Sequence, residues 1–255
     1  MGRNVRKTST SAICAPCAAL RRPGGAIPMC MACEVRDFTF CAALNTDEIA
    51  SVQAIVRQVR LAPSQLLFQE GDDAADLFNV VDGVILLYKM LPDGRRQITG
   101  FMYPGGFLGV AGASGYSYSA EALTQATLCR FPRRRLFTLF ERFPKLEHRL
   151  FGIATDELTA AQDQMLLLGR KTAPEKIASF LLTLAERTGA ADGAAEASIM
   201  VPMTRAHIAD YLGLTIETVS RTLGRLKRSG LIRVPDVHRV VITRRDDLEK
   251  IAEGG

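Results

Sequence analysis

Six cysteines are the side chains best suited to chemistry in this sequence, and their placement is uneven. Cys129 stands alone in the middle of the chain, whereas the other five lie within the first 41 residues: Cys14, Cys17, Cys30, Cys33 and Cys41. This N-terminal segment has three prolines and little hydrophobic periodicity, so it cannot bury a core of its own. Thiolates bind soft metal ions, and metal binding can supply the missing folding energy. We therefore predict a metal site in this segment.

Spacing alone offers two kinds of cysteine site. Cys14-x2-Cys17-x12-Cys30-x2-Cys33 has the spacing of a four-cysteine zinc site. The Cys14-Ala-Pro-Cys17 pair is a candidate for thiol oxidoreductase chemistry, but no βαβ pattern accompanies it. The zinc site is therefore the stronger of these two alternatives.

Composition excludes several other classes of protein. Hydrophobic residues make up 47% of the 255 residues and charged residues 23%, which is enough apolar material for one or two cores. No stretch approaches the ~18 consecutive apolar residues needed to cross a bilayer, and Pro16 interrupts a run that resembles a secretory signal. The three histidines, His148, His207 and His238, fall on separate predicted elements, so no Ser-His-Asp arrangement is expected. We expect a soluble, cytoplasmic protein that is not an enzyme.

A second candidate site lies near the C-terminus, in MTRAHIADYLGLTIETVSRTLGRLKRSGLIRV. Thr204 can cap a helix that runs to Tyr211, Gly213 supplies a tight turn, and Thr215 can cap a second helix. Apolar residues recur at helical spacing on the inward side of that second helix: Val219, Leu223 and Leu226. This pattern is typical of a helix-turn-helix, whose second helix enters the DNA major groove.

The outward side of the second helix carries groups that can read bases. Arg221 can grip guanine through two hydrogen bonds, Glu217 can accept one from cytosine, and Ser220 is short enough to reach a base or a thymine methyl. Gly224 completes this face. The alternative is an ordinary surface ion pair between Glu217 and Arg221. Residues 204–245 hold nine basic and three acidic side chains, a net +6, which favours nucleic acid over that alternative.

Phosphate contacts are expected around this face. The candidates are Thr204, Arg205, Thr215, Arg225, Lys227 and Arg228. The following RVPDVHRVVITRR predicts a β-hairpin wing that adds further arginines.

A long helix is predicted from Phe143 to about Arg170. Apolar residues repeat along it at alternating spacings of three and four, as in the seam of a coiled coil: Phe151, Ala154, Leu158, Ala161, Met165 and Leu168. The seam predicts pairing with a second copy of the chain, and the alternative is a helix that lies on its own domain. A further helix is predicted over residues 174–189, with Pro174 in its first turn and Gly189 past its end.

The residues before the long helix predict β structure. Thr46 is predicted to cap a short helix over TDEIASVQAIVRQVRL, which has Val59 near its end. Short β-rich runs follow, separated by turns that we predict to be hairpins: Asp82-Gly83, Pro92-Asp93-Gly94 and Pro104-Gly105-Gly106. Closely spaced strands predict an antiparallel roll. The expected fold class is α+β, with a cupin-like jelly roll (46–142) after the cysteine segment (1–45), a dimerisation helix (143–171) and a winged helix-turn-helix (172–255).

This order of elements over residues 46–250 resembles the CRP/FNR family of bacterial transcription regulators. YLGLTIETVSRTLGRLKRSGLI resembles the recognition segment of the FNR and FixK subgroups, and QDQMLLLGRK is similar to the end of the FNR dimer helix. The resemblance implies that Glu217, Ser220 and Arg221 read TTGAT in an inverted TTGAT/ATCAA site. It also implies a homodimer that binds double-stranded DNA and acts with RNA polymerase as an activator.

The resemblance also implies the signal that is sensed. FNR-type regulators sense oxygen with a 4Fe-4S cluster on three N-terminal cysteines and one cysteine of the roll. Cys30-Met-Ala-Cys33-x7-Cys41 resembles the C-x2-C-x7-C variant of that motif, and Cys129 occupies the roll position. Four soft thiolates suit such a cluster. Zinc binding and thiol-based redox sensing remain the alternatives, although the zinc spacing would leave Cys41 and Cys129 without a role.

Cyclic nucleotide is not an expected ligand. The CRP branch binds cyclic AMP through a Gly-Glu-Leu turn and an Arg-Ser-Ala turn, but Gly109 and Val110 stand at the position of that Glu, and Tyr118 at the position of that Arg. Without the cation, a buried phosphate would be unpaired at a cost of several kcal/mol. The resemblance therefore predicts an oxygen-responsive regulator of genes for anaerobic or microaerobic metabolism.

Overall fold

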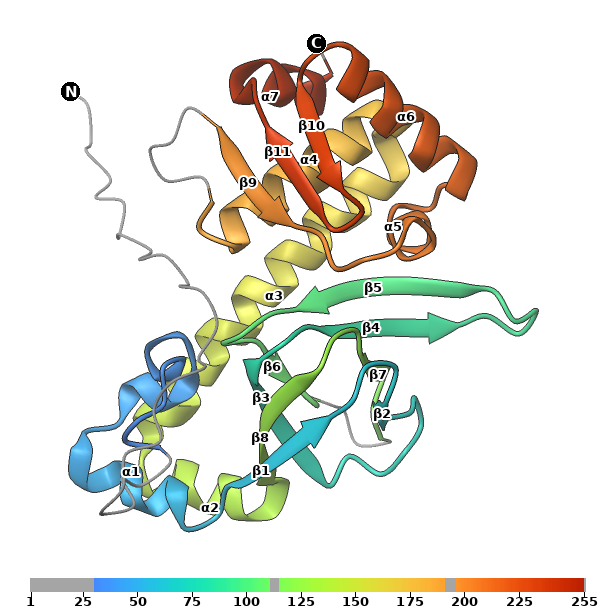
Figure 1. The fold of residues 1–255 in the computed structure, drawn as a ribbon. Coiled ribbons are helices and arrows are strands. Elements are labelled where there is room, and N and C mark those ends of the chain that lie inside the picture. Colours follow the sequence, from blue (N-terminus) through green and yellow to red (C-terminus); the bar gives the residue numbers. More distant parts are fainter. Residues whose placement is uncertain (1–29, 111–114, 191–195, 255) are drawn as a thin grey trace, which may run out of the picture. The chain divides into compact units, whose positions relative to one another are not determined.

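The computed structural model describes residues 30–110, 115–190 and 196–254 (Figure 1). They form two compact units: one holds the described residues up to Gly169 together with Ala206–Gly213, and the other holds Arg170–Arg205 and the residues from Leu214 onwards. Cys14 and Cys17 lie outside the described residues, so the predicted oxidoreductase site lies there entirely and the predicted zinc site in part. Within the described ranges, no helix is long and apolar enough to span a membrane.

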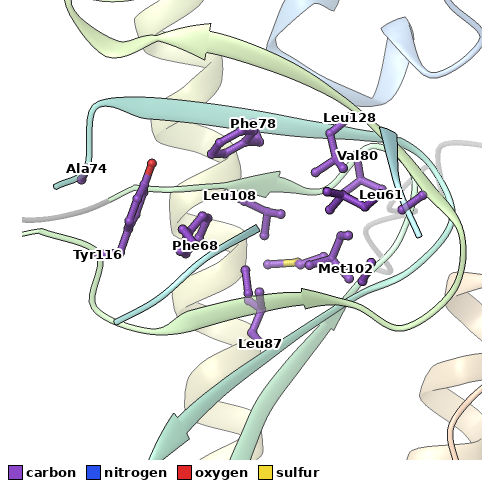
Figure 2. Close-up of a cluster of buried hydrophobic side chains, with 14 residues drawn as sticks. Leu61, Phe68, Ala74, Phe78, Val80, Leu87, Met102, Leu108, Tyr116 and Leu128 are labelled. Atoms are coloured by element: carbon purple, nitrogen blue, oxygen red, sulfur yellow. The ribbon is translucent and has the colours of Figure 1, made fainter. Parts of the chain in front are cut away.

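The first unit contains a jelly roll made of two four-stranded antiparallel sheets, as predicted. One sheet has the order β1-β8-β3-β6, with β1 Arg57–Leu61, β8 Ala126–Pro132, β3 Asp76–Asp82 and β6 Phe107–Leu108. The other has the order β2-β7-β4-β5, with β2 Leu66–Phe68, β7 Ser119–Ala122, β4 Ile85–Met90 and β5 Arg96–Met102. Side chains of both sheets, such as Phe78, Leu87 and Leu128, meet in one apolar core, which we call the roll core (Figure 2).

The three predicted hairpin turns are turns, but only the second joins two paired strands. Gly83, Gly94 and Gly105 all have positive φ angles, of 83°, 84° and 92°, which glycine adopts without steric cost. The turn at Gly94 joins β4 to β5, which pair with each other. The turns at Gly83 and Gly105 carry the chain from one sheet to the other, so the hairpin prediction is wrong there. A turn sequence fixes where the chain bends but not which strand it meets.

Helix α1 (Thr46–Gln53) begins and ends differently from the prediction. Its N-cap is Asn45, whose side chain accepts a hydrogen bond from the N–H of Glu48, while the Glu48 carboxylate accepts one from the N–H of Asn45. Thr46 is therefore the first helical residue and not the cap. Val59 lies in β1 rather than on the helix, because its β-branched stretch fits the sheet as well as it fits a helical period.

A second core covers the other face of the β1-β8-β3-β6 sheet, and we call it the outer core. It joins residues of β3, β6 and β8 to α1, to α2 (Arg133–Arg142), to the start of α3 (Pro144–Arg170) and to the short 3₁₀ helix η2 (Phe40–Ala43). A second 3₁₀ helix, η1 (Arg36–Phe38), precedes η2 and buries no residue. Phe40 is fully buried in the outer core. Its ring meets Phe107 and Phe131 edge to face, with centroids 5.5 and 5.2 Å apart.

The second unit contains the predicted C-terminal elements. Helix α4 (Ala173–Arg187) has Pro174 at its start and Gly189 past its end, as predicted. Strands β10 (Ile232–Asp236) and β11 (Arg239–Ile242) form the predicted wing hairpin, which β9 (Ala197–Met200) extends to three strands. The remaining helices of the C-terminal part are α5 (Arg205–Leu212), α6 (Ile216–Arg228) and α7 (Arg245–Glu253).

Replacing Gly83 with alanine should destabilise the roll far more than replacing Gly94. A Cβ on Gly83 would lie 2.3 Å from the carbonyl oxygen of Gln125 and 2.7 Å from Cα of Ala126, whereas a Cβ on Gly94 would meet nothing within 4 Å. Both variants share the cost of a positive φ, roughly 1–2 kcal/mol. Urea unfolding should show about that loss for Gly94→Ala and at least about twice as much for Gly83→Ala. Equal losses would contradict the steric explanation.

Candidate functional site

Four cysteine thiols from distant parts of the sequence lie near one another in the first unit. Cys30 and Cys33 lie in turns at the start of the described chain, Cys41 lies in η2, and Cys129 lies in the middle of β8. All four are free thiols, and each is buried or half-buried. Cys129 lies within electrostatic range of the other three, since a negative charge on any of them raises its pKa. The structure therefore places Cys30 and Cys41 in the outer core with Cys129 packed against it, and Cys33 lies within electrostatic range of Cys129.

Aromatic packing holds the cysteine segment against the roll. Phe40 directly precedes Cys41, and Phe131 follows Cys129 by two residues on the same face of β8. The contact between these two rings therefore places Cys41 beside the strand that carries Cys129. The hydroxyl of Thr39 also accepts a hydrogen bond from the N–H of Cys41, at 3.2 Å, and fixes the turn.

Burial strongly disfavours the charged form of these thiols. Desolvation is the main cause that raises the pKa of Cys41 and of Cys129 to about 12, and it also raises the pKa of Cys30 and of Cys33. The Arg36 guanidinium works in the opposite direction and lowers the pKa of the three N-terminal thiols. At neutral pH the four groups are thiols, so any metal that binds them must displace their protons.

Arg36 is held where it can act on these thiols. Its guanidinium donates a hydrogen bond to the carbonyl oxygen of Leu44, at 2.5 Å, across the cysteine segment. Sequence reasoning missed this residue, because nothing in a C-x2-C-x7-C spacing says which side chain turns back to the sulfurs. Among the described residues, no group of three or more His, Cys, Asp or Glu side chains is arranged around a single metal ion.

The two roll turns that bind cyclic AMP in the CRP branch are bonded to each other in this chain. The Tyr118 hydroxyl accepts a hydrogen bond from the N–H of Gly109, at 3.0 Å. A Cβ on Gly109 would lie 2.8 Å from the carbonyl oxygen of Asp76, so a glutamate does not fit there without a shift of the backbone. Tyr116 stacks on Phe68 with ring centroids 3.8 Å apart (Figure 2). Aromatic side chains of the chain itself therefore fill this part of the roll.

Helix α6 presents the predicted base-reading side chains to solvent. Thr215 is its N-cap, and the Thr215 hydroxyl accepts a hydrogen bond from the N–H of Thr218 at 3.2 Å. The predicted inward residues are all buried: Val219, Leu223 and Leu226. Thr222 is also buried, which the sequence analysis did not predict. Its spacing of three residues from Val219 places it on the same face of the helix and could have revealed it. The three predicted base-reading side chains are exposed, those of Glu217, Ser220 and Arg221, whereas Gly224 on the same predicted face is half-buried.

The charge on this face is available for recognition. Hydrogen bonds from its own backbone N–H and from the Thr215 hydroxyl lower the pKa of Glu217, so its carboxylate is an acceptor at neutral pH. The described side chains of Glu217 and Arg221 form no ion pair with each other, which speaks against the alternative of a simple surface pair. The predicted phosphate-binding residues of the last turn are exposed: Arg225, Lys227 and Arg228.

The three other predicted phosphate contacts lie at the N-terminal ends of α5 and α6. Thr204 precedes α5 and Thr215 precedes α6, and both are exposed. Arg205 is half-buried, and desolvation lowers its pKa. At the tip of the wing, Val237 is 76% exposed.

The predicted dimer seam of α3 is not covered by the rest of the described chain. Phe151 is 72% exposed, Leu158 60% and Met165 70%. Ala154 and Ala161 are also exposed, and Leu168 is half-buried. The start of the helix packs on its own domain, where Leu146 is buried in the outer core and Leu150 and Ile153 lie against it. Near its end, the Gln164 side chain donates a hydrogen bond to the carbonyl oxygen of Tyr211, at 3.0 Å. The alternative, in which the seam packs against the roll of its own chain, is therefore wrong.

Comparisons with known proteins match the roll and the helix-turn-helix. Residues 58–143 match the model of a cyclic nucleotide-binding domain, and residues 175–251 match that of a Crp-like helix-turn-helix domain. The transcriptional activatory protein AadR of Rhodopseudomonas palustris is 43% identical over 84% of this chain and 90% of its own length. The nitrogen fixation regulation protein FixK of Bradyrhizobium diazoefficiens is 42% identical over 80% and 86%.

A third relative and a solved structure extend the match. The transcriptional activator protein FnrL of Cereibacter sphaeroides is 36% identical over 84% of this chain and 88% of its own. The structure of FixK2 from Bradyrhizobium japonicum covers 77% of this chain and 97% of its own, with 33% identity and a TM-score of 0.72. With a matching roll, a matching helix-turn-helix and relatives aligned over most of both chains, this chain belongs to the CRP/FNR family of DNA-binding transcription regulators.

Proposed function

We propose that this chain is an oxygen-responsive transcription activator that holds a 4Fe-4S cluster on Cys30, Cys33, Cys41 and Cys129. The grouping of these four thiols carries the proposal, because three come from the N-terminal segment and the fourth comes from the middle of β8. Cysteine thiolates are the usual ligands of such clusters. Relatives named as nitrogen fixation regulation proteins and as the activator FnrL support a role in anaerobic or microaerobic metabolism.

The donor set fits the cluster better than it fits the alternatives. When bound, a 4Fe-4S cluster supplies an oxygen-sensitive redox group at the boundary between the cysteine segment and the roll. Phe40 keeps the cysteine segment on the sheet, and Arg36 offsets part of the negative charge of the thiolates. The zinc alternative uses Cys14 and Cys17, and it gives no role to the closeness of Cys41 and Cys129.

The signal is proposed to reach the DNA through the outer core. Cys30 and Cys41 are members of this core, and so is Leu146 at the start of α3. A change at the cysteines therefore alters the packing that supports this helix. The exposed seam further along α3 is the surface on which two chains would pair, since large apolar side chains left in water favour association. A homodimer would place two copies of α6 on one DNA site.

The DNA site and the other partners follow from the exposed face of α6. Glu217, Ser220 and Arg221 are proposed to read TTGAT in each half of an inverted repeat, and RNA polymerase is the partner in activation. Cyclic nucleotide is not a proposed ligand, because the Tyr118 and Gly109 turns bond to each other. We place the protein in the cytoplasm, where such DNA would be found.

Single Cys→Ser variants test the ligand assignment. The wild-type chain, purified without oxygen, should hold about four iron and four sulfide per chain. Cys129→Ser should lose most of both, because the serine hydroxyl is a poor replacement for a soft thiolate. Cys14→Ser should keep them, since the proposal gives Cys14 no role. Iron and sulfide analysis decides between the sites, and full iron in Cys129→Ser with loss in Cys14→Ser would favour an N-terminal site.

Two variants of α6 separate base reading from phosphate binding. Arg221→Ala should cost roughly 1–3 kcal/mol on a TTGAT site and relax the preference at one guanine, because a bidentate contact is lost. Lys227→Ala should weaken specific and random DNA alike and lower the salt dependence of binding. Binding titrations at several salt concentrations measure both effects. An equal loss on both DNAs for Arg221→Ala would refute its role in base reading.

A charge in the α3 seam tests the dimer. Ala161→Asp places two like charges across the paired helices and should give a monomer that binds DNA poorly even without oxygen. Thr159→Asp is the matched control, because Thr159 is exposed on the same helix and lies outside the seam. Sedimentation equilibrium measures the association. A fully dimeric Ala161→Asp protein would mean that the chains meet along another surface.

A further inference from the structure

One buried polar atom of the roll has no hydrogen-bond partner and lies beside the cysteine site. Asn79 in β3 is only 3% exposed, and its side-chain oxygen Oδ1 is enclosed without a partner. Buried polar side chains nearly always have a hydrogen-bond partner, because enclosing one without a partner costs free energy. Asn79 therefore destabilises the fold at a position on the strand that an apolar side chain could occupy.

The strand register places Asn79 next to the proposed ligand Cys129. The two residues are directly opposite each other in the antiparallel pair of β3 and β8. Opposed residues point to the same face, with Cβ atoms about 4.5–5.5 Å apart. Phe78 and Val80, on either side of Asn79, belong to the roll core, whereas Leu77 belongs to the outer core. Asn79 therefore faces the outer core, which also holds Cys30 and Cys41.

We propose that the side-chain amide of Asn79 donates a hydrogen bond to sulfur in the metal-loaded site, either to the Cys129 thiolate or to a sulfide of the cluster. This inference rests on the proposed function. The thiolates and sulfides of a bound cluster are negatively charged acceptors, and they would supply the partner that the amide otherwise lacks. A half-turn about the last side-chain torsion exchanges the oxygen and nitrogen of the amide, so the N–H₂ group can take the enclosed position.

The position of Asn79 gives the amide a tuning role and not a ligating one. Hydrogen bonds to the sulfurs of an iron–sulfur cluster stabilise its more negative, reduced form and raise its reduction potential. Arg36 and Asn79 would then act from opposite sides. Arg36 lies on the cysteine segment and acts through charge, while Asn79 lies on the sheet and acts through a neutral dipole.

Asn79→Leu in the full-length chain tests the inference, because leucine has the same branched arrangement of side-chain heavy atoms and no polar atoms. The variant should hold as much iron and sulfide as the wild type, but its cluster should have a lower reduction potential. The cluster-free variant should be at least as stable to urea as the cluster-free wild type, since the enclosed, unpartnered oxygen is gone. Asn79→Ala should shift the potential in the same direction if Asn79→Leu folds poorly.

Gln58→Leu is the matched control. Gln58 is opposite Cys129 on the other neighbouring strand, β1, but it is exposed to solvent. Gln58→Leu should leave the reduction potential of the cluster unchanged. A shift equal to that of Asn79→Leu would overturn a specific role for Asn79.

Other outcomes separate this inference from the proposed function. An unchanged potential in an iron-loaded Asn79→Leu protein overturns the hydrogen bond and leaves the cluster proposal intact. A gain in stability without a change in potential would mean that the enclosed oxygen is only an unpaired polar group of the fold, and it would also overturn the hydrogen bond. A wild-type chain that takes up no iron or sulfide when reconstituted anaerobically would contradict the proposed function, and the inference would fall with it.

Discussion

The insertion of Phe40 between Phe107 and Phe131 is the contact on which the account of this protein depends. The cysteine segment has little hydrophobic periodicity, and its fully buried Phe40 ring packs on the sheet together with Cys30, Cys41 and Leu44 in the outer core. This one contact brings Cys41 next to the strand of Cys129, although 88 residues separate the two in sequence. Without it, the N-terminal cysteines would have no fixed relation to the fourth thiol, and a shared site could not exist before the metal arrives.

The outer core also connects the cysteine site to the long helix α3. Its members include two of the cysteines and the first turns of α3, so packing near the thiols supports the helix whose far part carries the exposed seam. Protein cores are close-packed, and a change in one part is therefore felt by its neighbours. The roll core is separate, and its aromatic side chains fill the region in which related domains hold a nucleotide. The chain has kept the fold of a ligand-binding roll and moved its proposed sensor to the opposite face of one sheet.

The sequence predicted well the features that depend on local periodicity and capping. The inward and outward faces of α6 and the cap at Thr215 follow from spacing within one helix. The prediction was wrong where the outcome depends on distant partners. Val59 joined β1 because β8 was there to pair with it, and the turns at Gly83 and Gly105 changed sheets. Helix α2 was not predicted, because its start has three arginines and no capping side chain.

The residues of the candidate site also fall into those that the sequence predicted and those that it did not. Cysteine spacing and a family resemblance named four residues that the fold then brought together, but neither revealed Arg36 or Asn79. Arg36 acts because the segment bends back on itself, and Asn79 acts because of its register against β8. The bend of the segment and the register of the two strands both depend on the folded structure and not on local sequence. A half-buried Arg36 and a buried Asn79 beside a set of thiols are evident in the structure, but the sequence pattern does not reveal them.

The most direct test of the central claim is a Mössbauer spectrum of the full-length chain, isolated from cells grown on ⁵⁷Fe and kept free of oxygen. We expect most of the bound iron to belong to a 4Fe-4S cluster, and we expect this signal to disappear on exposure to air. A protein that carries zinc and no iron, or iron in a form that air leaves unchanged, would contradict it.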